Sequence, residues 1–525
     1  MAAALQERLS APSQGAASDA RGPAVWDNVR EFYRQRQGLP AWVTHLSPAK
    51  NAAAAVEILR TAPLHGLVVA DYGSAAIAEQ LKRLEHSAKS AADRREQLAD
   101  FDVRLTTALL TLGHDVALGH GSPDGLAPSW QARRTSPDLA GTLSKHADAN
   151  MAAWLDSIRP THPEYAALEA ALAHLRDTAK AGGWPVVAKA TFTAGHSSPA
   201  VTTLRKRLGA DGSAPAGVAA STSTTYDADL ATSVHTFQEH NGMRATGIAD
   251  AATIAAMNVS VDRRISQVET NLERWRWMPD DFGARYLLVN IPQFQVAMRE
   301  DGKTVNSIRV VVGKLEHETP IFSSEMSTIV FSPYWNIPDS IVTGETAPAA
   351  ARDPRYLAKH RIEILRVTTA GTSTVKPSQV SWNDAKELRQ LAFRQMPGPE
   401  NALGHVKFLF PNKYDVYLHD SPADELFARP GRALSHGCVR VEEPETLAQY
   451  VMRGDADWPL DKILTAMNSG VEKHVKLKQP LPVHIVYFTA FVDPNGGLHY
   501  LKDVYGYDAK QLVAAHTLSN VTRHN

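Results

Sequence analysis

The 525 residues contain one cysteine, Cys438, and lack any run of about 18 apolar residues, the length that a membrane-spanning helix requires. One thiol excludes an internal disulfide and is a poor basis for a zinc or iron–sulfur site. Charge is nearly balanced, with 55 basic and 56 acidic residues. Bulk charge therefore gives no support to nucleic-acid binding. Cys438 is either a buried apolar thiol or a nucleophile.

The length is too great for a single core and predicts about three or four domains. Residues 1–24 are rich in Ala, Ser, Gly and Gln, and we interpret them as a disordered lead-in. They lack the compact apolar segment of a secretory signal. The protein is therefore either cytoplasmic or exported through a signal that this chain does not carry.

Residues 25–191 predict a helical scaffold domain. Apolar residues recur at i, i+3, i+4 and i+7 in segments 52–59, 100–112 and 168–175. Alanine is abundant and β-branched residues are sparse, which agrees with helix propensity.

Residues 196–258 predict a second helical unit, interrupted by a polar loop over 211–225. Its apolar positions at helical spacing are Val201, Leu204, Leu208, Leu230, Val234, Phe237, Ile254 and Met257. Together with Phe237-Gln238, Gly242, Gly247 and Thr253, this pattern resembles the peptidoglycan-binding domain type 1, a three-helix module. An unrelated helical bundle is the alternative.

After a linking helix over 259–284, the pattern becomes β-like. Residues 286–299 and 305–312 alternate apolar and polar side chains and predict two strands joined by a turn at 300–302. Further predicted strands are 327–331, 407–409, 415–418, 483–491 and 498–500. The sequence thus predicts a multidomain α+β protein.

Three boundaries complete this organisation. We expect a mostly β catalytic domain over 285–475, within which 341–404 forms a capping insertion with helical pieces at 350–360 and 383–393. Residues 476–525 are expected to form a strand and helix segment that packs on the catalytic or the scaffold domain.

A catalytic cysteine reacts as its thiolate, and a free thiol has a pKa of about 8.5, so it needs a neighbouring base. The two candidate bases are His419 and His436. In an extended segment, His436 and Cys438 would lie about 6.5–7 Å apart, too far for a direct hydrogen bond. His419 ends a predicted strand that could lie beside Cys438. Spacing permits His419 more readily without deciding between them.

The residues around the thiol resemble a known family. Ser435-His436-Gly437-Cys438, followed by Arg440 and preceded by His419, is similar to the signature of the L,D-transpeptidase catalytic domain, in the long multidomain type of Gram-negative bacteria. The resemblance also takes in these segments: 32–33, 40–42, 319–320, 333–338, 401–404, 407–408 and 417–420.

The resemblance implies a role for each residue. Cys438 would be the nucleophile, His419 the general base and later acid, and the Gly437-Cys438 backbone would lie near the oxyanion site. The residues implied around the substrate are Arg440, Tyr417, Trp335, Asn336, Ser435 and His436, with His436 also bracing the motif. Arg440 could instead form a structural ion pair, and Trp335 and Asn336 could serve packing. No cofactor or metal is implied; a site made of His419, His436 and Cys438 is the rival interpretation.

The implied reaction cleaves terminal D-Ala from a tetrapeptide stem through a thioester and forms a 3→3 peptidoglycan cross-link. The implied partners are donor and acceptor stems, a D,D-carboxypeptidase that supplies tetrapeptides, and a membrane, bound peripherally or through an anchor; nucleic acid is not among them. The implied location is the periplasm, reached through an upstream signal or anchor, and carbapenems would acylate Cys438. The rivals are an L,D-carboxypeptidase, a D-amino-acid exchange enzyme and a non-catalytic wall-binding protein.

Overall fold

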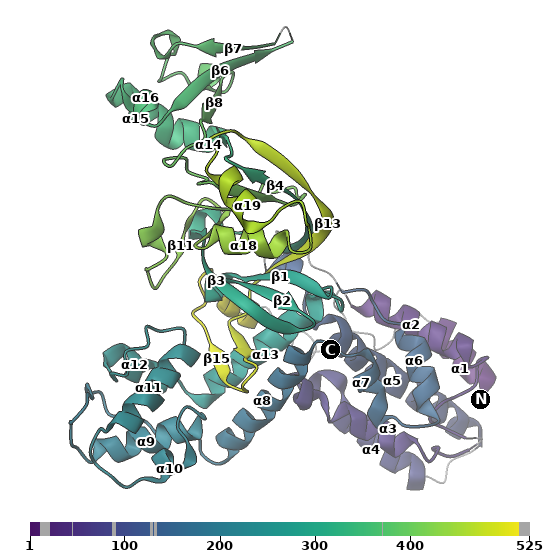
Figure 1. The fold of residues 1–525 in the computed structure, drawn as a ribbon. Helices are drawn as coiled ribbons and strands as arrows, with labels where there is room; N and C mark the ends of the chain where they lie inside the picture. The colour runs from purple at the N-terminus through teal and green to yellow at the C-terminus, as the bar shows by residue number, and fades with distance from the viewer. Residues whose placement is uncertain are drawn as a thin grey trace. The chain divides into compact units, whose positions relative to one another are not determined.

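The computed structural model describes residues 1–10, 21–44, 46–86, 91–126, 130, 134–369 and 371–513. The chain forms two compact units (Figure 1). The first comprises Met1–Asp281 and Phe488–Asn525, and the second comprises Phe282–Tyr487. The second unit is thus inserted between two segments of the first.

The scaffold region of the first unit is helical. Its helices are α1 (Ala2–Ser10), α2 (Gly22–Gln35), α3 (Ala52–Leu59), α4 (Ser74–His86), α5 (Ala91–Leu118), α6 (Leu139–Ala147), α7 (Ala152–Ile158) and α8 (Pro163–Lys180). Helix α5 contacts the six helices α1–α4, α6 and α7. Gly113 allows close packing on α5, because a Cβ atom there would lie 2.7 Å from the Trp154 ring. The predicted scaffold helices at 52–59, 100–112 and 168–175 are confirmed within α3, α5 and α8.

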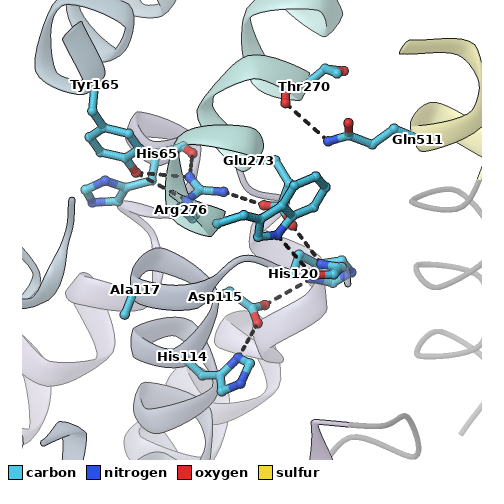
Figure 2. A network of polar contacts seen from close by, with 12 residues as sticks. His65, His114, Asp115, Ala117, His120, Tyr165, Thr270, Glu273, Arg276 and Gln511 are labelled. Atoms are coloured by element: carbon cyan, nitrogen blue, oxygen red, sulfur yellow. Dashed lines mark hydrogen bonds and ion pairs between the residues drawn. The ribbon is translucent and has the colours of Figure 1, made fainter. Parts of the chain in front are cut away.

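A network of buried polar groups runs through the scaffold region (Figure 2). The carboxylate of Asp115, on α5, is fully buried and pairs with Arg21. It also accepts a hydrogen bond from the Tyr72 hydroxyl at 2.9 Å and lies 3.0 Å from Nδ1 of His120. Burial alone would raise the pKa of Asp115, but the hydrogen bonds from His114 and His120 and the charge of Arg21 hold that pKa far below its usual range.

The next helices form the module predicted over 196–258. They are α9 (Ala200–Ala210), α10 (Ala216–Ala220), α11 (Ala228–His240) and α12 (Ala251–Met257). All eight apolar residues predicted for its core are buried in one cluster. Asp227 and Asp250 cap α11 and α12 by accepting backbone N–H groups at 2.9 and 2.8 Å. The predicted loop over 211–225 contains the short helix α10.

The Phe-Gln-Gly-Thr pattern of this module has a structural cause. The amide of Gln238 is buried, and its Oε1 accepts the backbone N–H groups of Thr246 at 2.7 Å and Gly247 at 2.9 Å. Its Nε2 donates to the Thr253 hydroxyl at 3.0 Å. Gln238 therefore fixes the turn between α11 and α12, where Gly247 adopts a φ of 67°.

Helix α13 (Val261–Trp277) joins this module to the second segment of the first unit. Asn271 donates to the Thr489 hydroxyl at 2.8 Å and accepts the Thr489 N–H at 2.9 Å. The Trp275 ring stacks on Phe488 with centroids 4.5 Å apart. The segment continues as the hairpin of β14 (Ala490–Val492) and β15 (Leu498–Tyr500), followed by a helix over 507–513.

The second unit is built on a nine-stranded sheet. Its strands are β1 (Arg285–Asn290), β2 (Gln295–Glu300), β3 (Lys303–Gly313), β4 (Phe322–Phe331), β9 (Val406–Leu409), β10 (Leu418–His419), β11 (Ala433–Ser435), β12 (Val439–Val441) and β13 (Lys473–Val486). Their order is β11-β3-β12-β10-β9-β4-β13-β1-β2, and β3 also pairs with β2, so the sheet closes on itself. Helices α18 (Pro444–Val451) and α19 (Leu460–Met467) also belong to this unit.

A cap with its own core lies between β4 and β9 in the sequence. Its four-stranded sheet has the order β5-β8-β6-β7. The strands are β5 (Trp335–Ile337), β6 (Ile362–Thr368), β7 (Gly371–Val375) and β8 (Ala392–Gln395), and the helices are α14 (Asp339–Ile341), a π-helical turn (Val342–Thr346), α15 (Ala347–Arg352), α16 (Tyr356–Lys359) and α17 (Ala385–Leu388).

The structure differs from the sequence-based expectation in several places. The strand predicted at 415–418 is reduced to β10, and the strand predicted at 483–491 is divided between β13 and β14. Residues 2–10 are helical rather than disordered, because Leu5 is buried and Arg8 pairs with Asp100 of α5 at 2.8 Å; residues 11–20 lie outside the described residues. The run 286–299 is two strands, since Pro292 lies in a 3₁₀ turn. Helix α17 ends at Leu388, and 392–395 form β8. The segment 476–525 divides after residue 487 between the two units.

Candidate active site

Cys438 lies in the tight connection between β11 and β12. Gly437 adopts a φ of 114°, a conformation that favours glycine. Ser435 spans the turn, because its hydroxyl accepts the Gly437 N–H at 3.1 Å and donates to the Cys438 carbonyl at 2.6 Å. The Thr319 hydroxyl donates to the Gly437 carbonyl at 2.8 Å and accepts the Gly313 N–H at 2.8 Å. Local hydrogen bonds therefore set the position of the thiol.

Strand pairing brings Cys438 beside the strand of His419. Strands β10 and β12 are parallel, with Leu418 opposite Val439 and His419 opposite Arg440. The Val439 N–H donates to the Tyr417 carbonyl at 3.1 Å. Because side chains alternate along a strand, Tyr417, His419, Cys438 and Arg440 share one face. The rings of Tyr417 and His419 have centroids 5.7 Å apart.

The Cys438 thiol is held in its protonated form. Burial raises the pKa of Cys438, although hydrogen bonds from the backbone and side chain of Tyr417 and the charge of Arg440 act in the opposite direction. The Sγ atom lies 3.8 Å from the Asp415 carbonyl oxygen. Attack by this thiol at neutral pH therefore requires a base that removes its proton.

His419 is buried and neutral. Burial and then the charge of Arg440 lower the pKa of His419 to about 3. Nδ1 lies 2.5 Å from the Asp420 carbonyl oxygen, which can only accept a hydrogen bond, so Nδ1 carries the ring proton. Nε2 is consequently left unprotonated and able to accept a proton. Among the described residues, no hydrogen bond joins this ring to Cys438; such contacts tighten when substrate binds.

Arg440 supplies a positive charge that is only partly compensated. Its Nε atom is buried and has no hydrogen-bond partner within the described part of the chain. Burial lowers the pKa of Arg440, while the charges of Cys438 and Glu425 raise it. The guanidinium lies on the same face as the thiol and is suited to an anionic group of a ligand or of a reaction intermediate.

His436 contacts the cap. Its side chain is exposed, with Nε2 3.0 Å from Glu345 of the cap and its ring centroid 5.1 Å from that of His317. The bracing role predicted for His436 stays a prediction, and Ser435 and Thr319 also brace the turn. Ser435, predicted at the substrate, is buried and uses its hydroxyl within the turn.

Trp335 and Asn336 belong to the cap. Both lie on β5, where Trp335 pairs with Gln395 and Asn336 pairs with Arg394. Trp335 is partly buried against the apolar core of the cap, and Asn336 is exposed. Their described contacts lie in the cap sheet.

Sequence reasoning missed the residues that support His419. The Asp420 carboxylate accepts the backbone N–H groups of His405 at 2.7 Å and Ser421 at 2.6 Å. Gly404 leaves room for it, since a Cβ atom there would lie 2.2 Å from Oδ2 of Asp420. The position of Asp420 directly after His419 was the sequence feature that could have indicated its supporting role.

Three families of known domains match parts of this chain. Residues 284–464 match the model of the L,D-transpeptidase catalytic domain, residues 197–257 match a peptidoglycan-binding domain, and residues 27–172 match a scaffold domain. Residues 284–464 are thus similar to L,D-transpeptidase catalytic domains. A Haemophilus influenzae protein that is named as an L,D-transpeptidase is 34% identical over 238 residues, which cover 45% of this chain and 47% of that protein. The chain thus aligns with about half the length of this relative.

Two solved structures are also similar. L,D-transpeptidase 3 from Mycobacterium tuberculosis is 13% identical, with a TM-score of 0.18, over 39% of this chain and 61% of that chain. An L,D-transpeptidase from Xylanimonas cellulosilytica is 13% identical, with a TM-score of 0.19, over 57% of this chain and 98% of that chain. These low scores add no support to the assignment. None of the helices in the described part of the chain is long and apolar enough to cross a membrane.

Proposed function

We propose that the chain is a cysteine-dependent L,D-transpeptidase that forms 3→3 cross-links in peptidoglycan. The observation that carries the proposal is the shared face of β10 and β12, which carries both Cys438 and a neutral His419 whose Nε2 is free to accept a proton. The match of residues 284–464 to the L,D-transpeptidase catalytic domain supports the same chemistry.

The first half-reaction transfers the donor stem to the enzyme. Nε2 of His419 takes the proton from Sγ of Cys438 as the sulfur attacks the carbonyl carbon that joins the third stem residue to D-Ala. The tetrahedral intermediate collapses as His419 returns the proton to the departing nitrogen. D-Ala leaves, and a thioester bond between Cys438 and the third residue remains.

The oxyanion of that intermediate needs a donor. Gly437 was expected here, but its N–H already donates to the Ser435 hydroxyl. The backbone N–H of Cys438 has no hydrogen-bond partner among the described residues, so we assign this donor to the oxyanion. Arg440 stabilises negative charge on the same face.

The second half-reaction releases the enzyme. The side-chain amine of an acceptor stem's third residue attacks the thioester while His419 removes its proton. Sulfur leaves and is reprotonated, and an amide joins the two stems. Water in place of the amine would give an L,D-carboxypeptidase, and a free D-amino acid would give exchange. The substrate and the peptidoglycan-binding match at 197–257 favour a location at the cell wall, outside the cytoplasm.

Muropeptide analysis tests the proposal. Cells that express the wild type should contain 3→3 dimers, whereas cells that express Cys438→Ala should not. His436→Ala is the matched control, because His436 contacts Glu345 of the cap, and it should retain dimers. Equal dimer levels with wild type and Cys438→Ala would overturn the proposal.

An assay with purified protein separates the rivals. Incubation with a disaccharide tetrapeptide should yield dimers; tripeptide alone would indicate a carboxypeptidase, and exchanged termini would indicate a D-amino-acid exchange enzyme. A carbapenem should form a covalent adduct on Cys438 that mass spectrometry detects. A non-catalytic wall-binding protein would form neither product nor adduct.

A further inference from the structure

Three potential metal ligands lie close together in the first unit, whereas Cys438 belongs to the second. They are His240 at the end of α11, Asp493 after β14, and His499 on β15 (the His-Asp-His cluster). One ligand atom from each lies within 4.8 Å of the other two, and all three residues are half-buried. Figure 1 shows β15 near α11 and α13, and contacts join α11 to β15.

The hairpin orients two of these side chains. Asp493 uses Oδ1 to accept the backbone N–H groups of Asn495 at 2.8 Å and Gly497 at 3.0 Å, while its Oδ2 faces Nε2 of His499 at 2.9 Å. The His499 ring stacks on Phe491, with centroids 4.6 Å apart and 8° between the planes. Such outer contacts are what metal-binding side chains use to fix their direction.

Contacts outside the His-Asp-His cluster hold the β14–β15 hairpin against α11. The Arg264 guanidinium lies 4.1 Å from the Tyr500 ring centroid and donates to Asn241, directly after α11, at 2.6 Å. Leu501 lies against Gly242, where a Cβ atom would be 3.0 Å from it. His240 and His499 are therefore brought together by the fold.

The space between the ligands is kept open by Gly497. A Cβ atom at this position would lie 2.6 Å from Nε2 of His240 and 2.9 Å from Oδ2 of Asp493. Among the described residues, His240 has no hydrogen-bond partner, although its ring lies 4.7 Å from that of His499.

We propose that the His-Asp-His cluster binds one divalent transition-metal ion, for which Zn²⁺ fits the donor set best. Two imidazoles and a carboxylate suit zinc, whereas magnesium and calcium prefer sites made of oxygen alone. Ligand atoms around tetrahedral zinc lie about 3.4 Å apart. The Asp493 and His499 ligand atoms, 2.9 Å apart, would therefore separate slightly, and any ligand atom as far as 4.8 Å from the others would move closer. The ion would displace the His499–Asp493 hydrogen bond, with the His499 proton moving to Nδ1, and would join α11 to the hairpin.

Calorimetric titration of the metal-free full chain with zinc chloride tests this site. The chain carries Cys438→Ala throughout, so that the thiol cannot bind zinc. We expect one equivalent of Zn²⁺ to bind, with affinity reduced at least about 100-fold by His499→Ala. Gly497→Ala should have a similar effect, because its methyl group fills the ligand space while no ligand is removed.

His235→Ala is the matched control. His235 lies on α11 and pairs with Glu239, outside the cluster, so its loss should leave zinc affinity within about two-fold. Zinc should also raise the thermal unfolding midpoint of the parent and of His235→Ala, but not of His499→Ala. Circular dichroism confirms that each variant is folded. Unchanged zinc affinity in folded His499→Ala, or no stoichiometric binding by the parent, would overturn the proposal.

Discussion

Buried polar groups differ between the scaffold network around Asp115 and the candidate active site around Cys438. The Asp115 carboxylate has partners in Arg21, Tyr72 and His120. In the active site, the buried Nε atom of Arg440 has no partner among the described residues. Nε2 of His120 in the scaffold network is also buried without a partner among the described residues, so the two regions differ in their charged groups. The Asp115 carboxylate is paired and holds elements together, whereas the Arg440 guanidinium keeps a donor that a ligand can complete. The same residue types thus serve structure in one region and chemistry in the other.

On the active-site side of this comparison, Cys438→Ser should have the largest effect, a loss of cross-linking activity. A hydroxyl is far harder to ionise than a thiol, so we expect cross-linking to fall by at least about 10⁴-fold. The substitution is nearly isosteric, and the unfolding free energy of the catalytic unit should change by less than about 1 kcal/mol. Turnover of tetrapeptide and thermal unfolding measure the two quantities. A ten-fold loss or less would contradict the assigned nucleophile.

Asp115→Ala should give the opposite result. It leaves the Arg21 charge buried without its carboxylate, and we expect the scaffold to lose about 3–5 kcal/mol of stability. Carbapenem acylation of Cys438 should proceed at the wild-type rate wherever the protein is folded. Asp177→Ala removes an exposed carboxylate that pairs with Lys180, and should change stability by less than about 0.5 kcal/mol. Equal destabilisation by both variants would show that the buried network around Asp115 contributes no more stability than an exposed ion pair.

Arg440→Met tests the uncompensated charge through the pH dependence of acylation. Arg440 lowers the pKa of both Cys438 and His419, so its removal should raise both. In the wild type, the neutral base persists down to about pH 3, so acylation through His419 should be independent of pH from there into the neutral range, without an inflection near pH 6.5, and should rise further only where the thiol itself ionises. The variant should shift the alkaline limb upward by about one pH unit or more. Superimposable profiles would exclude this role.

The pKa of His419 also predicts how the stability of the catalytic unit responds to acid. The pKa falls from about 6.5 in an unfolded chain to about 3 in the folded state. Between these values the unfolded chain binds the extra proton, so stability is complete above about pH 6.5 and declines as the pH falls toward 3. His419→Gln should reduce this decline, as thermal unfolding at several pH values would show. An unchanged acid dependence would contradict a buried neutral His419.

Thr319→Val should have the smallest effect on stability and activity. It removes a hydroxyl that holds the turn carrying the thiol. The loss of its hydroxyl leaves the Gly437 carbonyl and the Gly313 N–H without this partner. We expect a loss of about 1 kcal/mol in unfolding free energy and a measurable decrease in turnover. Thr374→Val, on the exposed surface of β7, is the control and should change neither. Identical behaviour of the two variants would deny Thr319 its bracing role.

The sequence predicted what depends on local pattern. The apolar stripes of residues 201–257 gave the core of the second helical module, because helical periodicity is written within a few turns. The short motif at 435–440 and His419 pointed to the site. That both lie on one face follows from parallel pairing of β10 with β12, which no local pattern contains.

The features that sequence reasoning missed depend on distant contacts. Thr319 precedes Gly437 by 118 positions, yet its hydroxyl holds the turn. The helix predicted at 383–393 includes the first two residues of β8, where pairing with β5 and β6 produces a strand instead. Helix α1 is stabilised by burial of Leu5 and by Asp100. Tertiary contacts override weak local preference in each case.

The insertion of one unit within the other has a consequence for the order of synthesis. Thr489, which exchanges two hydrogen bonds with Asn271, is made more than two hundred residues later. Residues Phe282–Tyr487 are complete before that partner leaves the ribosome. Domains fold as units during translation. A nascent chain that is stopped after residue 487 should therefore already contain a folded catalytic unit with its reactive thiol. Helix α13 would still lack its contacts with Thr489 and the β14–β15 hairpin.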